Sequence, residues 1–317
     1  MWFGASEESA RAIEAKAIAA LDDGEHDRAL ALADELLAMR WSGGFEIKAL
    51  AMAGTGDREG ATRVLEAALE NVPDAWRLWH LLGNLRSDLG RADAALKAYD
   101  NAVSRGGSGE ISLLYNRAIA RHRRGDPGGA LADLEPILAL PRPPGPIAED
   151  VLSLTARCLS EIGRAADGLA MVEDALSRAA DDDPRRPRLH AEHAMALSRA
   201  GEREGAREAF SLAADAGIVT PGFLALGRSL LSEVKGPHVR YQLILQALTP
   251  DADQTGFLRV FDVVALSPDD ATTLCVAHLD EGTRAGADVE RCSVMEPAST
   301  LERGVHGVSP RHWFTEP

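Results

Sequence analysis

Small and apolar residues recur along the chain at fixed distances from a series of glycines. In each copy, a small residue follows the glycine after five positions, and apolar residues follow after nine and twelve. Apolar positions three and four residues apart lie on one face of a helix, so each copy predicts a helix that begins after its glycine. The six copies are Gly24 with Ala29, Ala33 and Leu36; Gly56 with Ala61, Leu65 and Ala68; Gly90 with Ala95, Tyr99 and Ala102; Gly125 with Ala130, Leu134 and Ile137; Gly163 with Gly168, Val172 and Ala175; and Gly201 with Ala206, Phe210 and Ala213.

The glycine has a physical role in each copy, which is to end one helix before the next begins. Because it has no Cβ, it adopts at little cost the left-handed conformation that stops a helix. The small residue that follows lets the second helix approach the first closely, and the two apolar positions reach the core between pairs. The glycines lie 32, 34, 35, 38 and 38 residues apart. A helix–turn–helix unit with this period predicts an α-solenoid of about six repeats.

The third copy carries a resemblance to a known family. Its residues at the signature positions are Trp79, Leu82, Gly83, Gly90, Ala95, Tyr99 and Ala102. In this order they resemble the tetratricopeptide repeat family, and the second copy ends on Pro73, at the family's terminal proline position. The other copies carry alanine where the third has Gly83, at Ala17, Ala49, Ala118, Ala156 and Ala194. The resemblance covers roughly residues 8 to 217.

A different pattern follows the array. Residues 220–234 are predicted to form an amphipathic helix that caps the last repeat with a polar outer face. The segments HVRYQLILQAL and GFLRVFDVVAL are rich in β-branched and aromatic residues and predict a β-hairpin. SPDDATTLCVAHL predicts a helix, and DVERCSVMEPA a third strand. We therefore expect two domains, an array with its cap at residues 8–235 and a small α+β (β-β-α-β) module at 237–317.

The composition agrees with a helical, water-soluble chain. Of 317 residues, 45% are apolar but 5% aromatic, so the core must rely on Ala and Leu. The formal charge of −15 argues against binding to nucleic acid, which requires clustered Lys and Arg. The sequence has neither a signal-peptide pattern nor a run of ~18 apolar residues, and its three cysteines lack CxxC spacing. We expect a cytoplasmic protein with no membrane contact, and the high content of Ala, Arg and Gly indicates a bacterial source.

The resemblance implies a recognition surface. In the family, the first helices of successive repeats line a concave groove that binds an extended peptide or a helix of a partner. Counting back from each glycine places these residues in the groove: Arg77, His80, Asn84, Tyr115, Asn116, Ile119, His122, Arg123, Arg157 and Arg199, with Glu192 near the last. The middle of the groove is thus more basic than the chain as a whole. This composition suits an acidic or carboxylate-bearing peptide or protein.

One subfamily clamps a C-terminal carboxylate with Lys and Asn on one repeat, Asn on the next, and Lys with Arg on the third. Asn84 and Asn116 match two of these positions, but His80 stands where Lys is expected. The third repeat offers Asp150 and Leu154 instead of cations. A full clamp is therefore disfavoured against a general peptide groove, and a scaffold whose partners bind elsewhere stays open.

Two sets of residues raise the question of a metal site. His190 and His193 fall at packing positions of the repeat, with no third ligand nearby in sequence, so packing is favoured. In the C-terminal module, four ligands chosen from Cys275, His278, Cys292, His306 and His312 could form a tetrahedral zinc site. Cys275 belongs to an apolar stripe and Cys292 alternates within a strand, so buried thiols are the favoured interpretation. We expect neither metal nor cofactor.

The sequence contains no recognised catalytic motif, so no enzyme is predicted. The predicted function is a scaffold or adaptor that holds a peptide or protein segment in its groove. One alternative is a C-terminal module that is catalytic or senses a ligand, regulated by the array; a pocket with Cys275, His278 or His306 would favour it. Another is a neutralising protein that blocks one tight partner. Self-association through exposed end repeats also stays open.

Overall fold

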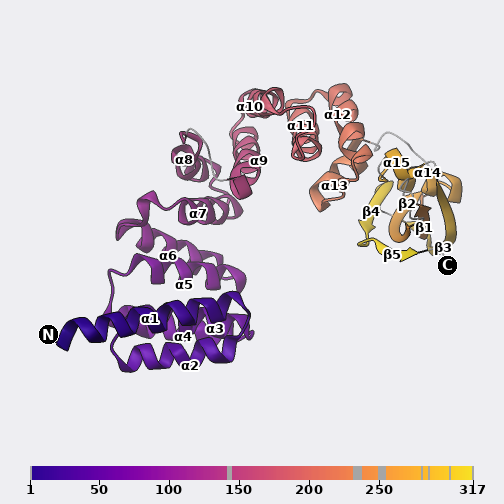
Figure 1. Ribbon diagram of the computed structural model, residues 1–317. Coiled ribbons are helices and arrows are strands. Elements are labelled where there is room, and N and C mark those ends of the chain that lie inside the picture. Colours follow the sequence, from indigo (N-terminus) through magenta and orange to yellow (C-terminus); the bar gives the residue numbers. More distant parts are fainter. Residues whose placement is uncertain are drawn as a thin grey trace. The chain divides into compact units, whose positions relative to one another are not determined.

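A computed structural model describes residues 2–140, 145–230, 238–248, 255–279, 281–284, 286–299 and 301–315 (Figure 1). The chain divides into two compact units, Met1–Cys158 and Leu159–Pro317. The boundary falls inside a helix, and each unit is considered by itself. The predicted domain boundary at residues 235–237 lies outside the described residues and stays a prediction.

The first unit consists of helices that follow one another as antiparallel pairs (Figure 1). This arrangement confirms the predicted tetratricopeptide-like repeat, and the short turns hold the helices of each pair together. The helices are α1 (Trp2–Asp22), α2 (His26–Ala38), α3 (Gly43–Gly54), α4 (Arg58–Asn71), α5 (Trp76–Asp88), α6 (Ala92–Ser104), α7 (Ile111–Arg123), α8 (Pro127–Leu138) and α9 (Gly145–Glu161), with a 3-10 turn at Gly107–Gly109.

The repeat glycines have the backbone conformation that the pattern predicts. Gly24, Gly56, Gly90 and Gly125 in the first unit have φ between 73° and 95°, and Gly163 and Gly201 in the second have φ of 82° and 86°. The apolar positions that follow the first four glycines are buried. Large fully buried side chains of this unit are aliphatic, among them Leu36, Leu65 and Leu134, as the low aromatic content predicts.

Gly83 stands in the third repeat where the other repeats have alanine, and the reason is steric. A Cβ at Gly83 would lie 2.4 Å from Cε1 of the Tyr99 ring, much closer than van der Waals contact allows. Three other copies with alanine at this position, all within the first unit, have a smaller residue at the position of Tyr99, namely Ala33, Leu65 and Leu134. The sixth has Phe210, which stacks on Phe223 instead. The size of Tyr99 therefore requires a glycine at position 83.

We predict that Gly83→Ala lowers the free energy of unfolding by about 1–3 kcal/mol, because it overpacks the core against Tyr99. Adding Tyr99→Leu removes the clash, so the double variant should lose at least about 1 kcal/mol less than the sum of the single losses. Urea denaturation of the four proteins measures this coupling. Simple additivity would show that the ring and the glycine do not constrain each other.

The second unit contains the array helices α10 (Ala165–Arg178), α11 (Arg186–Ala200), α12 (Arg203–Asp215) and α13 (Pro221–Leu230). The last of these was expected to cap the array with a polar outer face. Instead α13 is buried on two sides: Phe223 packs with Ala191 and Ala213 of the array, whereas Leu224 belongs to the core of the C-terminal module. The module itself therefore covers the end of the array. Residues 231–234 of the predicted helix lie outside the described residues.

The C-terminal module contains the predicted β-β-α-β order, with further elements. These are β1 (His238–Leu248), β2 (Thr255–Ala265), α14 (Pro268–Val276), α15 (Glu281–Arg284), β3 (Ala287–Ser299), β4 (Gly304–Val308) and β5 (His312–Thr315). The described strands form a five-stranded antiparallel sheet in the order β3-β1-β2-β4, with β5 also paired to β2. The short β4 and β5 were not predicted, because GVHGV and HWFT have little strand signal of their own and gain their pairing from β2.

The core of the module lies between the sheet and α14. Alternate residues of the hairpin, such as Leu243 and Leu245 of β1 and Phe257 and Phe261 of β2, are fully buried there. Cys275 of α14 packs against them. In the part of the chain that the structure describes, no helix is long and apolar enough to cross a membrane.

Candidate functional site

A hollow of about 500 Å³ lies between the first helices of two successive repeats, α7 and α9. Five of the predicted groove residues line it. The lining residues are Tyr115, Ile119, His122 and Arg123 of α7 and Asp150, Ser153, Leu154 and Arg157 of α9. We call this the middle hollow.

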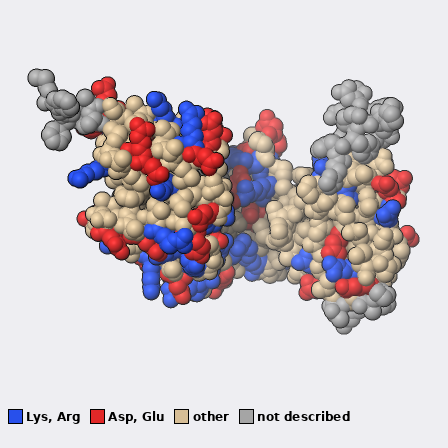
Figure 2. All heavy atoms as spheres, turned by 90° about the horizontal axis from the view of Figure 1, so that it is seen from below, with Lys and Arg blue, Asp and Glu red and all other residues tan. Residues whose placement is uncertain are grey.

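The middle hollow combines apolar contact surface with positive charge. Ile119 and Leu154 give it aliphatic walls, and Tyr115 adds an aromatic ring. Arg123 and Arg157 are both exposed, whereas Asp150, the carboxylate among the described lining residues, is half-buried. On the face seen in Figure 2, Lys and Arg are interspersed with Asp and Glu. The local charge at the middle hollow therefore differs in sign from the net charge of the chain.

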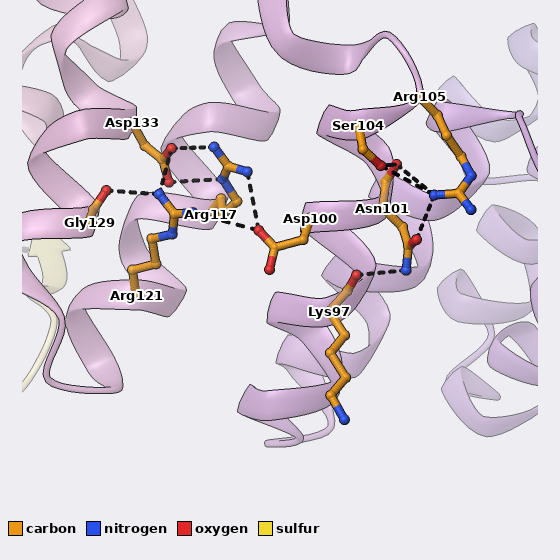
Figure 3. A network of polar contacts seen from close by, with 9 residues as sticks. All are labelled: Lys97, Asp100, Asn101, Ser104, Arg105, Arg117, Arg121, Gly129 and Asp133. Atoms are coloured by element: carbon orange, nitrogen blue, oxygen red, sulfur yellow. Dashed lines mark hydrogen bonds and ion pairs between the residues drawn. The ribbon is translucent and has the colours of Figure 1, made fainter.

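A second face of α7 fixes the helix in the array. Arg117 and Arg121 extend from it toward Asp133 of α8 and Asp100 of α6 (Figure 3). Arg117 donates from Nε to Oδ2 of Asp133 at 2.9 Å and through a second, shorter bond to Oδ1, so this pair is bidentate. Arg121 Nη1 lies 3.0 Å from Asp133 Oδ1 and donates to the carbonyl of Gly129 at 3.0 Å.

Asp133 is 2% exposed and the side chain of Arg117 11%, so this pair is the buried centre of a cluster of two arginines and two aspartates, whereas the side chain of Asp100 is 51% exposed at its edge. Asp100 completes it, with its Oδ1 3.2 Å from Arg117 Nη1. The cluster ties three helices together behind the middle hollow. The side chains that α7 presents to the hollow are therefore carried on a fixed helix.

Three predicted groove residues form a hydrogen-bonded chain across α5, α6 and α7. Asn116 Nδ2 donates to Asn84 Oδ1 at 3.0 Å and lies 3.3 Å from His80 Nε2. The hydroxyl of Tyr99 donates to the same Asn84 oxygen at 3.0 Å. Burial lowers the pKa of His80, against the weaker opposite effect of Glu110. A neutral His80 does not supply the cation that a carboxylate clamp has at this position. The hydrogen bonds among His80, Asn84 and Asn116 are therefore better explained as a link between helices.

Another hollow, of about 630 Å³, lies on the first helices of the earlier repeats. Because it is nearer the start of the sequence than the middle hollow, we call it the first hollow. Arg77 lies here. It is surrounded mainly by acidic and aliphatic residues, and Ile18 and Leu50 are 48% and 39% exposed. The lining residues are Glu14, Ile18, Leu21, Asp22, His26, Gly43, Glu46, Ile47, Leu50 and Arg77.

Burial raises the pKa of Glu46 in the first hollow, Arg77 opposes this rise, and the charge of Glu14 adds to it. Sequence reasoning missed this site, although a signal was available. His80 and Tyr115 each lie ten residues before a repeat glycine, and the equivalent positions in three other repeats hold Glu14, Glu46 and Ser153. Asn84, Ile119 and Arg157 each lie six residues before a repeat glycine. The equivalent positions in the first two repeats hold Ile18 and Leu50.

The remaining candidates lie in the second unit. Arg199 is half-buried at the end of α11, and Glu192 is 7% exposed, which places it in the interior. His193 Nε2 lies 3.6 Å from Glu173 Oε1. Cys275 is buried as expected, but Cys292 is exposed, so the expectation of a buried thiol was wrong for Cys292. His306 Nε2 lies 2.7 Å from the carbonyl of Glu302. Among the described side chains, no three His, Cys, Asp or Glu residues gather as metal ligands, and the side chain of His312 lies outside that part.

Comparisons with known proteins place few limits on this chain. No protein-family model matches it. Protein FlbA of Caulobacter vibrioides (strain ATCC 19089 / CIP 103742 / CB 15) is 33% identical over 126 residues, which are 39% of this chain. The match spans 21% of that protein's length.

Solved structures with similar folds include PilW, a widely conserved type IV pilus biogenesis factor, with a TM-score of 0.49 and 20% identity over 60% of this chain and 84% of PilW. MamA has a TM-score of 0.47 and 18% identity over 54% of this chain and 89% of MamA. YrrB, a TPR protein with an unusual peptide-binding site, has a TM-score of 0.46 and 17% identity over 54% of this chain and 84% of YrrB. These values carry no function over to this chain. The repeat fold rests on the helix pairs and glycines described above.

Proposed function

We propose that this chain is a protein-interaction scaffold that binds an extended segment of a partner along the first helices of its repeats. The segment places a carboxylate, from Asp, Glu or a chain terminus, in the middle hollow. The observation that carries this proposal is the pairing of Arg123 and Arg157 with aliphatic walls in one hollow of about 500 Å³. No bond-making step is needed, because holding and positioning the partner is the function.

The chemistry of the middle hollow favours a carboxylate over other groups. Guanidinium groups bind carboxylates through charge-assisted hydrogen bonds, often two at a time. Ile119, Leu154 and Tyr115 provide contact area for an apolar residue beside the acid. The ionic cluster behind α7 keeps these groups in place before binding, which lowers the entropy lost on association.

The first hollow favours a different residue in the same partner segment. Its carboxylates, Glu14, Asp22 and Glu46, outnumber Arg77 and His26, and its exposed aliphatic residues suit an apolar side chain. Both hollows lie in the first unit. We propose that the bound segment carries a Lys or Arg with an aliphatic neighbour at one end and an acidic residue at the other. Such a pattern would also fix the direction in which the segment binds.

The test is a pull-down from lysate, with the intact chain compared to the double variant Arg123→Glu/Arg157→Glu. The matched control is Arg164→Glu/Arg178→Glu, which changes the net charge equally at side chains that are 60% and 77% exposed at the N-cap and the last residue of α10. We expect the control to retain the partners of the intact chain and the hollow variant to lose them at least tenfold. Equal retention by both variants would refute the middle hollow as the binding site. One tight partner in place of several would favour the neutralising role.

A further inference from the structure

A pocket of about 310 Å³ lies beside the first hollow, and two tryptophans form part of its wall. Trp41 stands just before α3, and Trp76 is the first residue of α5. Glu14 of α1 and Glu46 of α3 also line the pocket, and both belong to the wall of the first hollow as well. We call this the indole pocket.

The two carboxylates of the indole pocket have no partner in the protein. Glu14 and Glu46 are half-buried, and among the described residues neither forms a hydrogen bond or an ion pair. Burial raises the pKa of Glu46, Arg77 lowers it, and the charge of nearby Glu14 raises it further. Half-buried carboxylates with unused lone pairs favour a ligand that brings positive charge and N–H donors.

Arg77 lines the same pocket but does not neutralise these carboxylates. Its guanidinium carbon lies 5.5 Å from the centroid of the Trp76 ring, and it forms no ion pair with a described carboxylate. Two carboxylates and one guanidinium leave one negative charge in excess. The contact with Trp76 also shows that an indole of this pocket accepts a guanidinium over its ring.

Gly43, the first residue of α3, lets Glu14 and Trp41 come close together. A Cβ at Gly43 would lie 2.1 Å from Glu14 Oε1 and 3.1 Å from Trp41 Nε1, so both atoms pack against the bare Cα. The indole N–H of Trp41 donates to no described residue. A glycine at this position therefore leaves the room that the carboxylate of Glu14 occupies in the pocket.

We propose that the indole pocket binds a guanidinium group, the side chain of an arginine in the partner segment. A guanidinium is planar and stacks on an indole, and its five N–H donors can bond to two carboxylates at once. The ammonium of lysine has three donors on a single atom and no flat face, so it fits this combination less well. The inference rests on the proposed function and names arginine as the basic residue of the bound segment.

The test is a titration of the full chain with three blocked amino acids, the N-acetyl methylamides of arginine, lysine and citrulline. Citrulline has the shape of arginine without its charge. Binding is followed by the indole N–H signals of Trp41 and Trp76 in proton–nitrogen NMR spectra, assigned with Trp41→Phe and Trp76→Phe. We expect saturable shifts with the arginine probe, at least fivefold weaker binding of the lysine probe, and none with citrulline. Absence of saturable shifts with the arginine probe, or equal affinity for lysine or citrulline, would overturn the proposal.

Two variants place the probe in the indole pocket. Gly43→Ala keeps every charge and displaces the carboxylate of Glu14, which lies at the end of a flexible side chain, so the protein should fold. Glu46→Gln removes one charge at nearly constant size. Each should weaken the arginine probe at least fivefold, and urea denaturation checks that each variant is folded. Arginine binding that is unchanged in both folded variants would contradict the site.

The matched controls lie outside the pocket. A Cβ at Gly128 in α8 would lie 4.0 Å from Asp126 Oδ1, which is ordinary contact, so Gly128→Ala adds the same methyl group without displacing a side chain. Glu59→Gln removes a charge from a side chain that is 48% exposed. Neither control should change the affinity for the arginine probe. A loss in the controls as large as in the pocket variants would refute a specific role of the indole pocket.

The same variants in the lysate pull-down separate this proposal from the proposed function. A single-residue probe needs no partner, so its binding does not depend on the middle hollow. We expect Gly43→Ala to retain partners at least fivefold less than Gly128→Ala does. If the arginine probe fails to bind while Arg123→Glu/Arg157→Glu still loses the partners, the indole pocket alone is refuted. If the probe binds but Gly43→Ala and Glu46→Gln retain all partners, the bound segment does not place an arginine there, which also overturns the proposal.

Discussion

Asp133→Asn is expected to lower the free energy of unfolding by about 3 kcal/mol, as measured by urea denaturation. Asparagine has nearly the same size as aspartate, so the substitution removes the charge and leaves the packing. Arg117, whose side chain is 11% exposed, would then keep a largely buried guanidinium without its bidentate partner. Removing one member of a buried ion pair typically costs about 3–5 kcal/mol. The lower end applies here because Asp100 still lies 3.2 Å from Arg117 Nη1.

The control for this prediction is Glu59→Gln. Glu59 pairs with Arg91 through side chains that are each 48% exposed, and exposed pairs contribute about 0–1 kcal/mol. A loss at Asp133 no larger than the loss at Glu59 would mean that the cluster does not hold α7 to its neighbours. The rigid support that the proposal assigns to the middle hollow would then be wrong.

Acid is expected to destabilise the second unit through His278. An unfolded histidine titrates near pH 6.5, whereas burial lowers the pKa of His278 to about 4. The charge of Arg259 adds to this shift, a hydrogen bond with the backbone of Ile218 opposes it, and Arg284 lowers the pKa further. Between pH 6.5 and 4 the unfolded state therefore binds a proton that the folded state does not, and stability falls as the pH falls.

The expected loss from His278 approaches about 3 kcal/mol at pH 4, and it is absent above pH 7. The loss is measured from the free energy of unfolding of the wild type and of His278→Leu across pH 4–8. Carboxylates that titrate in this range contribute equally to both proteins, so the difference between the two pH dependences isolates the contribution of His278. His306→Leu is the control, since the ring of His306 contacts the backbone carbonyl of Glu302. Parallel pH profiles for the wild type and His278→Leu would show that His278 is not held neutral.

The helices could be predicted from the sequence because their signals are local. Gly90 must adopt a left-handed conformation, and Ala95 must be small, whatever the rest of the chain does. The short strands β4 and β5 could not be predicted in the same way. They pair with β2, whose residues Val263 and Leu258 lie about 40 to 55 positions earlier, and no local pattern encodes that pairing.

The candidate site was predictable in part. Counting from the glycines grouped Tyr115, Ile119 and Arg157, and these three residues line one hollow, because the repeat fixes which positions of successive first helices are equivalent. It did not reveal that Asn84 and Asn116 bond to each other, since side-chain partners depend on distances between repeats. The indole pocket was also out of reach, because Trp41 and Trp76 lie outside the positions that were counted from the glycines.

The measurement that tests the central claim most directly is photo-crosslinking from inside the middle hollow. A benzophenone amino acid replaces Ile119, and in a matched protein it replaces Leu138, which is 36% exposed on the second helix α8. After irradiation in lysate, mass spectrometry identifies the crosslinked peptides. The account predicts crosslinks at position 119 to segments with an acidic residue or a C-terminus, and their loss in the Arg123→Glu/Arg157→Glu background. Crosslinks at position 138 but none at 119 would contradict it.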